Sequence, residues 1–235
     1  MKILIVAATH GDELLGIEVY KRLLQKKSPL LEYIDFIIGN PRAHAAHSRY
    51  IDTDLNRCYG VDGVTYEHKR AQEIVHYIKV TTPDLVLDMH TTACKQPSCL
   101  IISSLSGEMK QRMLASSHIT NVLQVKPMHD ITTCGNDVIG YEVTNDSIKD
   151  TLLDEIIADL QRFIDNSRSF PSKKLFEMQD KIYKKSVTKE QAATFINFEL
   201  HALGYVPIMT GDNSYKRQTD YLGFESKPGV EIRLL

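Results

Sequence analysis

Two histidines and one glutamate have the residue types and the placement of metal ligands. His10 and Glu13 lie in ATHGDELLG, directly after the apolar run ILIVAA, and His90 ends a second apolar run, DLVLDMH. Two imidazoles and one carboxylate form the ligand set of a catalytic zinc site, which keeps a fourth position open for water. Such a site would carry out hydrolysis. A single HxxE arises easily by chance, so this hypothesis depends on all three residues together.

The segments that precede these residues are typical of buried strands. Residues 3–8 are a continuous apolar run, as in strands that are covered on both faces, and residues 85–89 are predicted to be another buried strand. In open α/β sheets, ligands bind just beyond the carboxyl ends of the strands. We therefore expect a rigid sheet to hold His10, Glu13 and His90 at one of its edges.

The first two thirds of the chain alternate between strand and helix patterns. Further strands are predicted at 33–39, 99–103, 122–125 and 140–143, and helices at 14–24, 65–79, 108–117 and 148–163. This alternation predicts an α/β fold, with a mostly parallel or mixed central sheet and helices on both of its faces.

The helical period disappears near the segment SRSFPS. The segments that follow look like short strands: KLFEMQDKIY, FINFEL, YVPIMT, TDYLGFES and GVEIRLL. We therefore predict a zinc-hydrolase catalytic domain over residues 1–168 and a small β-rich C-terminal domain over residues 169–235.

The polar stretch 40–57, NPRAHAAHSRYIDTDLNR, is predicted to be irregular rather than helical. It carries Arg49, Asn56 and Arg57, and arginine binds carboxylates through two parallel hydrogen bonds. An ordinary charged surface loop is the alternative. Asp54 is placed to turn this loop by accepting a backbone hydrogen bond.

Two acidic residues lie in segments that otherwise read as strands. Glu142 lies in DVIGYEVTN, and a buried glutamate must be paired, protonated or bound to a cation. It is either a general base beside the metal or a glutamate at a strand edge that faces solvent. Asp88 shares a strand face with His90; it either orients a ligand or an arginine, or is a strand-end carboxylate with no catalytic part.

Together these motifs resemble the aspartoacylase and succinylglutamate desuccinylase family, which is related to the zinc carboxypeptidases. HGDE, NPRA…RYIDTDLNR, LDMH and GYEV follow one another in the family's order over about residues 1–145, and GDNSY matches more weakly. The resemblance implies a carboxypeptidase-like α/β core and a β-rich C-terminal domain that closes over the active site. It also implies one Zn²⁺ per chain, bound by His10, Glu13 and His90.

The resemblance implies a role for five further residues. Glu142 matches the catalytic general base and proton shuttle, and Arg49 matches the arginine that polarises the scissile carbonyl. Asn56 and Arg57 match the pair that binds the substrate α-carboxylate. Tyr215, in GDNSY, matches a tyrosine that contacts the substrate.

The sequence departs from the family at one point. Members that act on N-acetylaspartate carry a tyrosine and an arginine ten to fourteen residues before the catalytic glutamate. Met128 and Thr132 stand at those positions here. A cation that binds the substrate side-chain carboxylate is therefore missing, unless Lys126 or His129 supplies it. N-acetylaspartate is therefore not the expected substrate.

The resulting hypothesis is a zinc-dependent amidohydrolase that cleaves a small N-acyl amino acid to a carboxylate and a free amino acid. One alternative is a zinc carboxypeptidase that acts on a peptide or a cell-wall fragment, with the same metal ligands and carboxylate anchor. Another is a metal-stabilised binding module without catalysis, which would have no need of a base such as Glu142.

The composition and charge of the chain predict its class of partner and its cellular location. The chain has 235 residues and a net charge of −2, and its lysines form only short pairs, so no basic field favours nucleic acid. The four cysteines form no CxxC and are expected to be free thiols. No apolar stretch approaches the ~20 residues of a membrane span, and the N-terminus does not resemble a signal peptide. We expect a cytoplasmic protein without membrane or nucleic-acid partners, and a homo-oligomer stays open.

Overall fold

The computed structural model describes residues 1–126, 128–135, 137–211 and 219–234. The strands are β1 (Ile3–Ala7), β2 (Ile34–Ile38), β3 (Leu85–Thr92), β4 (Cys99–Ile102), β5 (Asn121–Gln124), β6 (Val138–Thr144), β7 (Ser172–Tyr183), β8 (Val206–Ile208), β9 (Tyr221–Ser226) and β10 (Val230–Arg233). The α-helices are α1 (Leu15–Gln25), α2 (Pro41–Ala45), α3 (Tyr66–Thr81), α4 (Glu108–Ser116), α5 (Asp150–Ile164) and α6 (Lys189–Ala193). Short 3-10 helices include η2 (Leu55–Arg57) and η3 (Ile131–Cys134).

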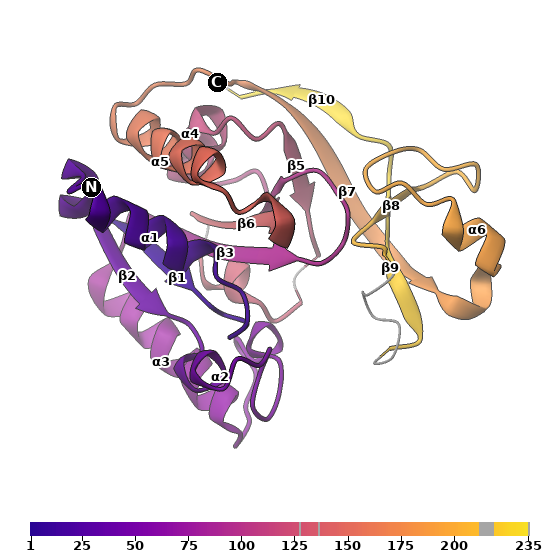
Figure 1. Cartoon of the computed structure of the whole chain (residues 1–235), viewed down its shortest axis with the longest axis horizontal. Coiled ribbons are helices and arrows are strands. Elements are labelled where there is room, and N and C mark those ends of the chain that lie inside the picture. The colour runs from indigo at the N-terminus through magenta and orange to yellow at the C-terminus, as the bar shows by residue number, and fades with distance from the viewer. Residues whose placement is uncertain (127, 136, 212–218, 235) are drawn as a thin grey trace.

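The strands form one mixed sheet, in the order β2-β1-β3-β6-β4-β5-β7-β9-β8, with β10 paired to β7 (Figure 1). Strands β2, β1, β3 and β6 are parallel to one another, whereas β4 is antiparallel to β6. The carboxyl ends of β1, β3 and β6 therefore meet at one edge of the sheet, as expected from the sequence.

Helices cover both faces of the parallel half of the sheet, and the strand period explains how. Ile3 and Ile5 belong to the core beneath α1, α4 and α5, whereas Leu4 and Val6 face the second core with Ile74 of α3. Because both faces of β1 are buried, its sequence is a continuous apolar run. The predicted α/β class is confirmed.

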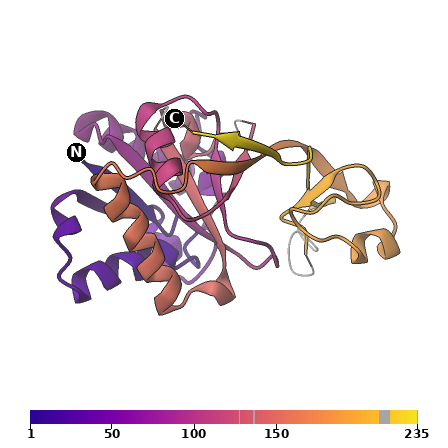
Figure 2. The same cartoon turned by 90° about the horizontal axis from the view of Figure 1, so that it is seen from above.

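The C-terminal part is a small β region joined to the core by β7. The first half of β7 pairs with β5 and β10, and its second half pairs with β9. Figures 1 and 2 show this long strand running from the core sheet into the C-terminal part. The proposed boundary between residues 168 and 169 stays a prediction.

Three local predictions were wrong. Residues 41–45 form helix α2 rather than a loop, because Asn40 accepts a hydrogen bond from Ala43 N at 3.1 Å and caps the helix. The segment FINFEL is not a strand; the buried Asn197 side chain holds it by donating to Lys95 O and Thr210 O. Helix α6 was missed, although Thr188 begins it with a capping box.

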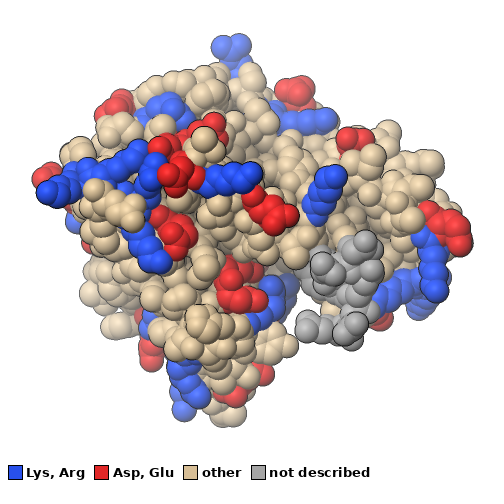
Figure 3. All heavy atoms as spheres, viewed as in Figure 1, with Lys and Arg blue, Asp and Glu red and all other residues tan. Residues whose placement is uncertain are grey.

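The surface and the thiols add three observations. On the face shown in Figure 3, side chains of both charge signs are intermixed. All four cysteines are free. Among the described residues, no helix has the length and the apolar character needed to cross a lipid bilayer.

A buried lysine lies where β7 enters the core. Lys173 is 1% exposed, and its ammonium donates to Ser117 O at 2.6 Å and to Ile119 O at 2.7 Å. Burial, which is only partly offset by the charge of Asp159, lowers the pKa of Lys173 to about 8. The folded state therefore binds this proton less tightly than the unfolded chain does.

This difference predicts a specific pH dependence of stability. Between about pH 8 and the ordinary lysine value of 10.5, the unfolded chain binds more protons, so the contribution of Lys173 to the free energy of unfolding should rise with pH. Denaturant unfolding of wild type and Lys173→Met at pH 7.5 and 9.5 measures it. The stability of wild type relative to the variant should increase at the higher pH. An unchanged difference would contradict the buried, weakly basic ammonium.

Candidate metal centre

The three predicted ligands come from two strand ends and meet in one place. His10 and Glu13 lie in the loop between β1 and α1, which begins where Ala8 adopts a left-handed φ of 51°. His90 lies within β3, which continues three residues further than expected, to Thr92. Because β1 and β3 are adjacent and parallel, the loop after β1 passes directly over His90.

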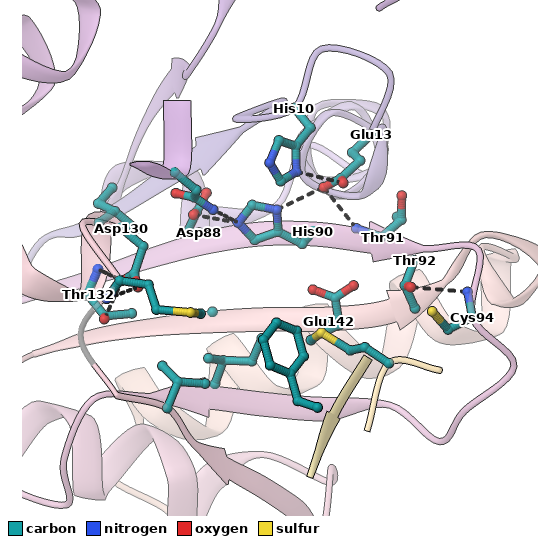
Figure 4. A pocket seen from close by; sticks show the side chains of 18 of the residues that line it. His10, Glu13, Asp88, His90, Thr91, Thr92, Cys94, Asp130, Thr132 and Glu142 are labelled. Carbon is teal, nitrogen blue, oxygen red and sulfur yellow. Dashed lines mark hydrogen bonds and ion pairs between the residues drawn. The ribbon is translucent and has the colours of Figure 1, made fainter. Parts of the chain in front are cut away.

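The convergence of the ligands is close and buried. Glu13 Oε1 lies 2.7 Å from His10 Nδ1, and Glu13 Oε2 lies 2.8 Å from His90 Nδ1 (Figure 4). One candidate ligand atom from each residue lies within 4.8 Å of the others. Each of the three residues is at most 6% exposed.

The outer nitrogens of both imidazoles are held by carboxylates. His10 Nε2 lies 3.0 Å from Asp54 Oδ1, and His90 Nε2 lies 2.5 Å from Asp88 Oδ2. Thr9 donates in turn to Asp88 at 2.6 Å. Histidines that bind a metal through one nitrogen usually donate the other N–H to such an acceptor. The two Nδ1 atoms and the Glu13 carboxylate thus fit a zinc ion, with Asp54 and Asp88 orienting the rings.

The protonation states follow from the same contacts. Burial alone would raise the pKa of Glu13, but His10 and His90 outweigh it and lower that pKa. Burial would lower the pKa of His90, yet Asp88 and Glu13 raise it well above its ordinary value. The pKa of His10 is also raised, because Glu13 and Asp54 outweigh its burial. A carboxylate at Glu13 is the form that binds a cation.

Glu142 faces this group from the neighbouring strand. It lies on β6, directly opposite His90 of β3 in the sheet register, and it is 7% exposed. Burial raises its pKa to about 7; the charge of Glu13 reinforces this shift and that of His90 opposes it. The alternative of a solvent-facing glutamate at a strand edge is therefore wrong. The carboxyl group can both accept and release a proton near neutral pH.

The polar stretch before α3 brings its residues to the same place. Arg49 donates to Asp54 at 3.2 Å and to Glu13 at 3.5 Å, and Asn56 Nδ2 lies 3.3 Å from His90 Nε2. Asp54 accepts from Asn56 N at 2.9 Å, which is the expected turn at the start of η2. Arg57 is exposed and borders the same pocket.

A buried glutamate that the sequence analysis missed fixes the shape of this stretch. Glu67 of α3 is fully buried and accepts hydrogen bonds from Ile51 N, Asp52 N and Thr53 N at 2.7–3.2 Å. Asn40 Nδ2 donates to the same carboxylate at 3.2 Å. Nothing in the local sequence distinguishes Glu67 from a solvent-exposed residue in the first turn of a helix.

A pocket of about 300 Å³ opens over the convergent ligands. All predicted site residues that the structure describes line it: His10, Glu13, Arg49, Asn56, Arg57, His90 and Glu142. Tyr215, the remaining predicted substrate contact, lies outside the described residues. Figure 4 shows Glu142 between two groups, with Asp130 and Thr132 on one side and Thr92 and Cys94 on the other.

Residues 126–132 decide whether a cation replaces the missing family arginine at the pocket. Lys126 and His129, the two suggested substitutes, are exposed and are not among the lining residues. Met128 and Thr132 do line the pocket, together with the carboxylate of Asp130. The sequence carried no signal for Asp130, because its role depends on where η3 lies relative to the ligands.

The sequence of this chain is similar to a known enzyme family over its N-terminal part. The family model described as the succinylglutamate desuccinylase/aspartoacylase catalytic domain matches residues 1–143. A probable aspartoacylase from Prochlorococcus marinus (strain MIT 9515) is 35% identical over 112 residues, which are 43% of this chain and 37% of that protein. An N-acyl-aromatic-L-amino acid amidohydrolase (carboxylate-forming) from Rattus norvegicus is 35% identical over 142 residues, 54% of this chain and 42% of that protein. These matches thus span less than half of either relative.

Solved structures share the fold over the whole chain. Murine aminoacylase 3 superposes with a TM-score of 0.72 at 16% identity, covering 100% of this chain and 97% of that one. A succinylglutamate desuccinylase from Chromobacterium violaceum gives a TM-score of 0.73 at 17% identity, covering 98% and 85%. Both comparisons bear on the fold, including the C-terminal β region.

The assignment of His90 as a ligand predicts the metal content of a variant. His90→Ala should retain well below one equivalent of zinc after purification, because two ligands do not hold the ion as three do. Elemental analysis measures it, and His76→Ala, which removes an exposed histidine of α3, is the control. A full equivalent of zinc in His90→Ala would remove His90 from the ligand set.

Proposed function

This chain belongs to the succinylglutamate desuccinylase/aspartoacylase family, and from this premise we propose that it is a zinc-dependent amidohydrolase of N-acyl amino acids. The products would be a carboxylate and a free amino acid. The observation that carries the proposal is the convergence of His10, Glu13 and His90 in one pocket that Glu142 and Arg57 also line. A metal set, a base and a carboxylate anchor are the parts that this reaction needs.

The proposed metal site would supply Lewis-acid chemistry. A zinc ion held by His10, Glu13 and His90 would act as a Lewis acid and lower the pKa of water towards neutrality. Asp54 and Asp88 would keep both imidazoles oriented for binding. The Arg49 guanidinium, which already contacts Glu13 and Asp54, would donate to the substrate carbonyl oxygen as negative charge develops on it.

Glu142 would move the proton. It would take a proton from the water as the water oxygen bonds to the amide carbon, and it would deliver that proton to the nitrogen as the C–N bond breaks. A pKa of about 7 suits both halves of this transfer. Its position opposite His90 on the adjacent strand supports this role.

Asn56 and Arg57 would anchor the substrate. A guanidinium binds a carboxylate bidentately, and the amide of Asn56 adds a neutral partner. Asn56 Oδ1 is buried and has no hydrogen-bond partner among the described residues, so it is available to a substrate N–H. Holding the α-carboxylate would align the amide bond with the attacking water.

The names of the relatives favour this deacylase over the alternative zinc carboxypeptidase. Because the matched segments span less than half of the two curated relatives, the identity of the acyl group is not carried over from them. The role of Tyr215, a cytoplasmic location and the oligomeric state stay predictions.

Removing the base should separate catalysis from metal binding. Glu142→Gln should lower kcat by a factor on the order of 10² to 10⁴, because a positioned general base contributes that much. Zinc content should stay at the wild-type level, since Glu142 is not assigned as a ligand. Steady-state kinetics with N-acetyl amino acids and elemental analysis test it, with Glu231→Gln on β10 as the exposed control. Near-normal turnover would exclude Glu142 as the base.

Removing the anchor should weaken binding of substrates that carry an α-carboxylate. Arg57→Ala should raise KM by about 10- to 100-fold, the worth of a charge-assisted hydrogen bond. N-acyl amino acid amides, which lack the α-carboxylate, should lose much less. Arg168→Ala, at another exposed arginine, is the control. An equal loss for both kinds of substrate would contradict the anchor role.

A further inference from the structure

One wall of the pocket adjoins the proposed carboxylate anchor. Tyr59, two residues after Arg57, donates its backbone N–H to His129 O at 3.0 Å. This hydrogen bond ties the segment 128–132 to the end of η2. Asn56, Arg57 and this segment line the same pocket, so an amino acid whose α-carboxylate is held by Asn56 and Arg57 can place its side chain against the segment.

The wall carries a fixed carboxylate. Asp130 is 7% exposed and caps η3, and its Oδ1 accepts from both the backbone N–H and the hydroxyl of Thr132. Its Oδ2 lies 3.4 Å from Met128 N. These hydrogen bonds give both carboxylate oxygens a donor and hold the side chain at the pocket wall.

The same pocket also presents apolar side chains. Met128 precedes it on the same wall, and Ile101 of β4 and Val125 after β5 line the pocket and pack in the same hydrophobic cluster as Met128. A side chain that enters here loses water and meets methyl and thioether groups. Burial of apolar substrate surface is favourable, whereas burial of a second substrate carboxylate would need a partner.

Resting on the proposed deacylase function, we infer that the substrate is an N-acyl derivative of an amino acid with an uncharged, apolar side chain, and that Asp130 is a specificity-determining residue. Asp130 acts against acidic side chains by like-charge repulsion. Apolar side chains gain contact with Met128, Ile101 and Val125. The wall thus selects by attraction and by repulsion together.

The size of the repulsion can be stated as a rate ratio. Two carboxylates about 5 Å apart at the edge of a protein interior repel one another by an amount worth on the order of a hundredfold in kcat/KM. Asp130→Asn removes the charge and keeps the shape, and asparagine also caps helices well. The ratio of kcat/KM for N-acetylmethionine over N-acetylaspartate should therefore fall at least about tenfold in this variant.

The experiment compares the zinc-loaded wild type, Asp130→Asn and the control Asp165→Asn. Asp165 is exposed and does not line the pocket. Its variant changes the net charge by the same amount as Asp130→Asn but leaves the pocket unchanged. Each is assayed with N-acetyl derivatives of methionine, leucine, aspartate and lysine. We expect wild type and Asp165→Asn to prefer the two apolar substrates, and the preference over aspartate to shrink only in Asp130→Asn.

The outcomes separate this inference from the proposed function. If wild type hydrolyses none of the four substrates, the proposed function fails. If it hydrolyses them but prefers aspartate, or if Asp130→Asn leaves the ratio unchanged, the specificity role of Asp130 is wrong and the deacylase assignment stands. A preference for lysine that Asp130→Asn abolishes would make Asp130 a receptor for cations, which also overturns the inference.

Discussion

The site depends on one carboxylate shared between two imidazoles. Each oxygen of Glu13 faces the Nδ1 atom of one histidine, and the three side chains are almost fully buried. A carboxylate in such surroundings is costly unless both oxygens are matched, so the loop after β1 and the end of β3 must keep a fixed separation. Asp54 and Asp88 extend the pattern outwards, and acid and imidazole alternate over five side chains.

The order of the strands in the sheet meets this requirement. β3 lies between β1 and β6, so the loop that carries His10 and Glu13 approaches His90 from one side and Glu142 approaches it from the other. β4 pairs with the other edge of β6 in the antiparallel direction, and its Ile101 lines the pocket wall. The proposed metal ligands, base and specificity wall thus come from five neighbouring strands, β1, β3, β6, β4 and β5, and the segments at their ends. Rigid strands hold such groups more accurately than loops do.

The sequence predicted those parts whose signals are local. The apolar runs before His10 and around His90 identify strands buried on both faces, and a parallel sheet then places both residues at one edge. The helix after Asn40 was missed because an Asn-Pro pair begins turns as well as helices. FINFEL has the composition of a strand, but the side chain of Asn197 holds the segment through hydrogen bonds to distant residues. Asp130 could not be found, since only the tertiary fold brings η3 to the pocket.

The hydrogen bonds from residues 51–53 to Glu67 affect the entropic cost of binding a substrate. Three consecutive backbone N–H groups, those of residues 51–53, donate to one buried carboxylate, so the chain between Arg49 and Asn56 is rigid before anything binds. An arginine on a loose loop loses conformational freedom when it captures an anion, and that loss weakens affinity. Here folding has already paid most of the entropic cost. Substrate binding should therefore need little rearrangement of this stretch of backbone.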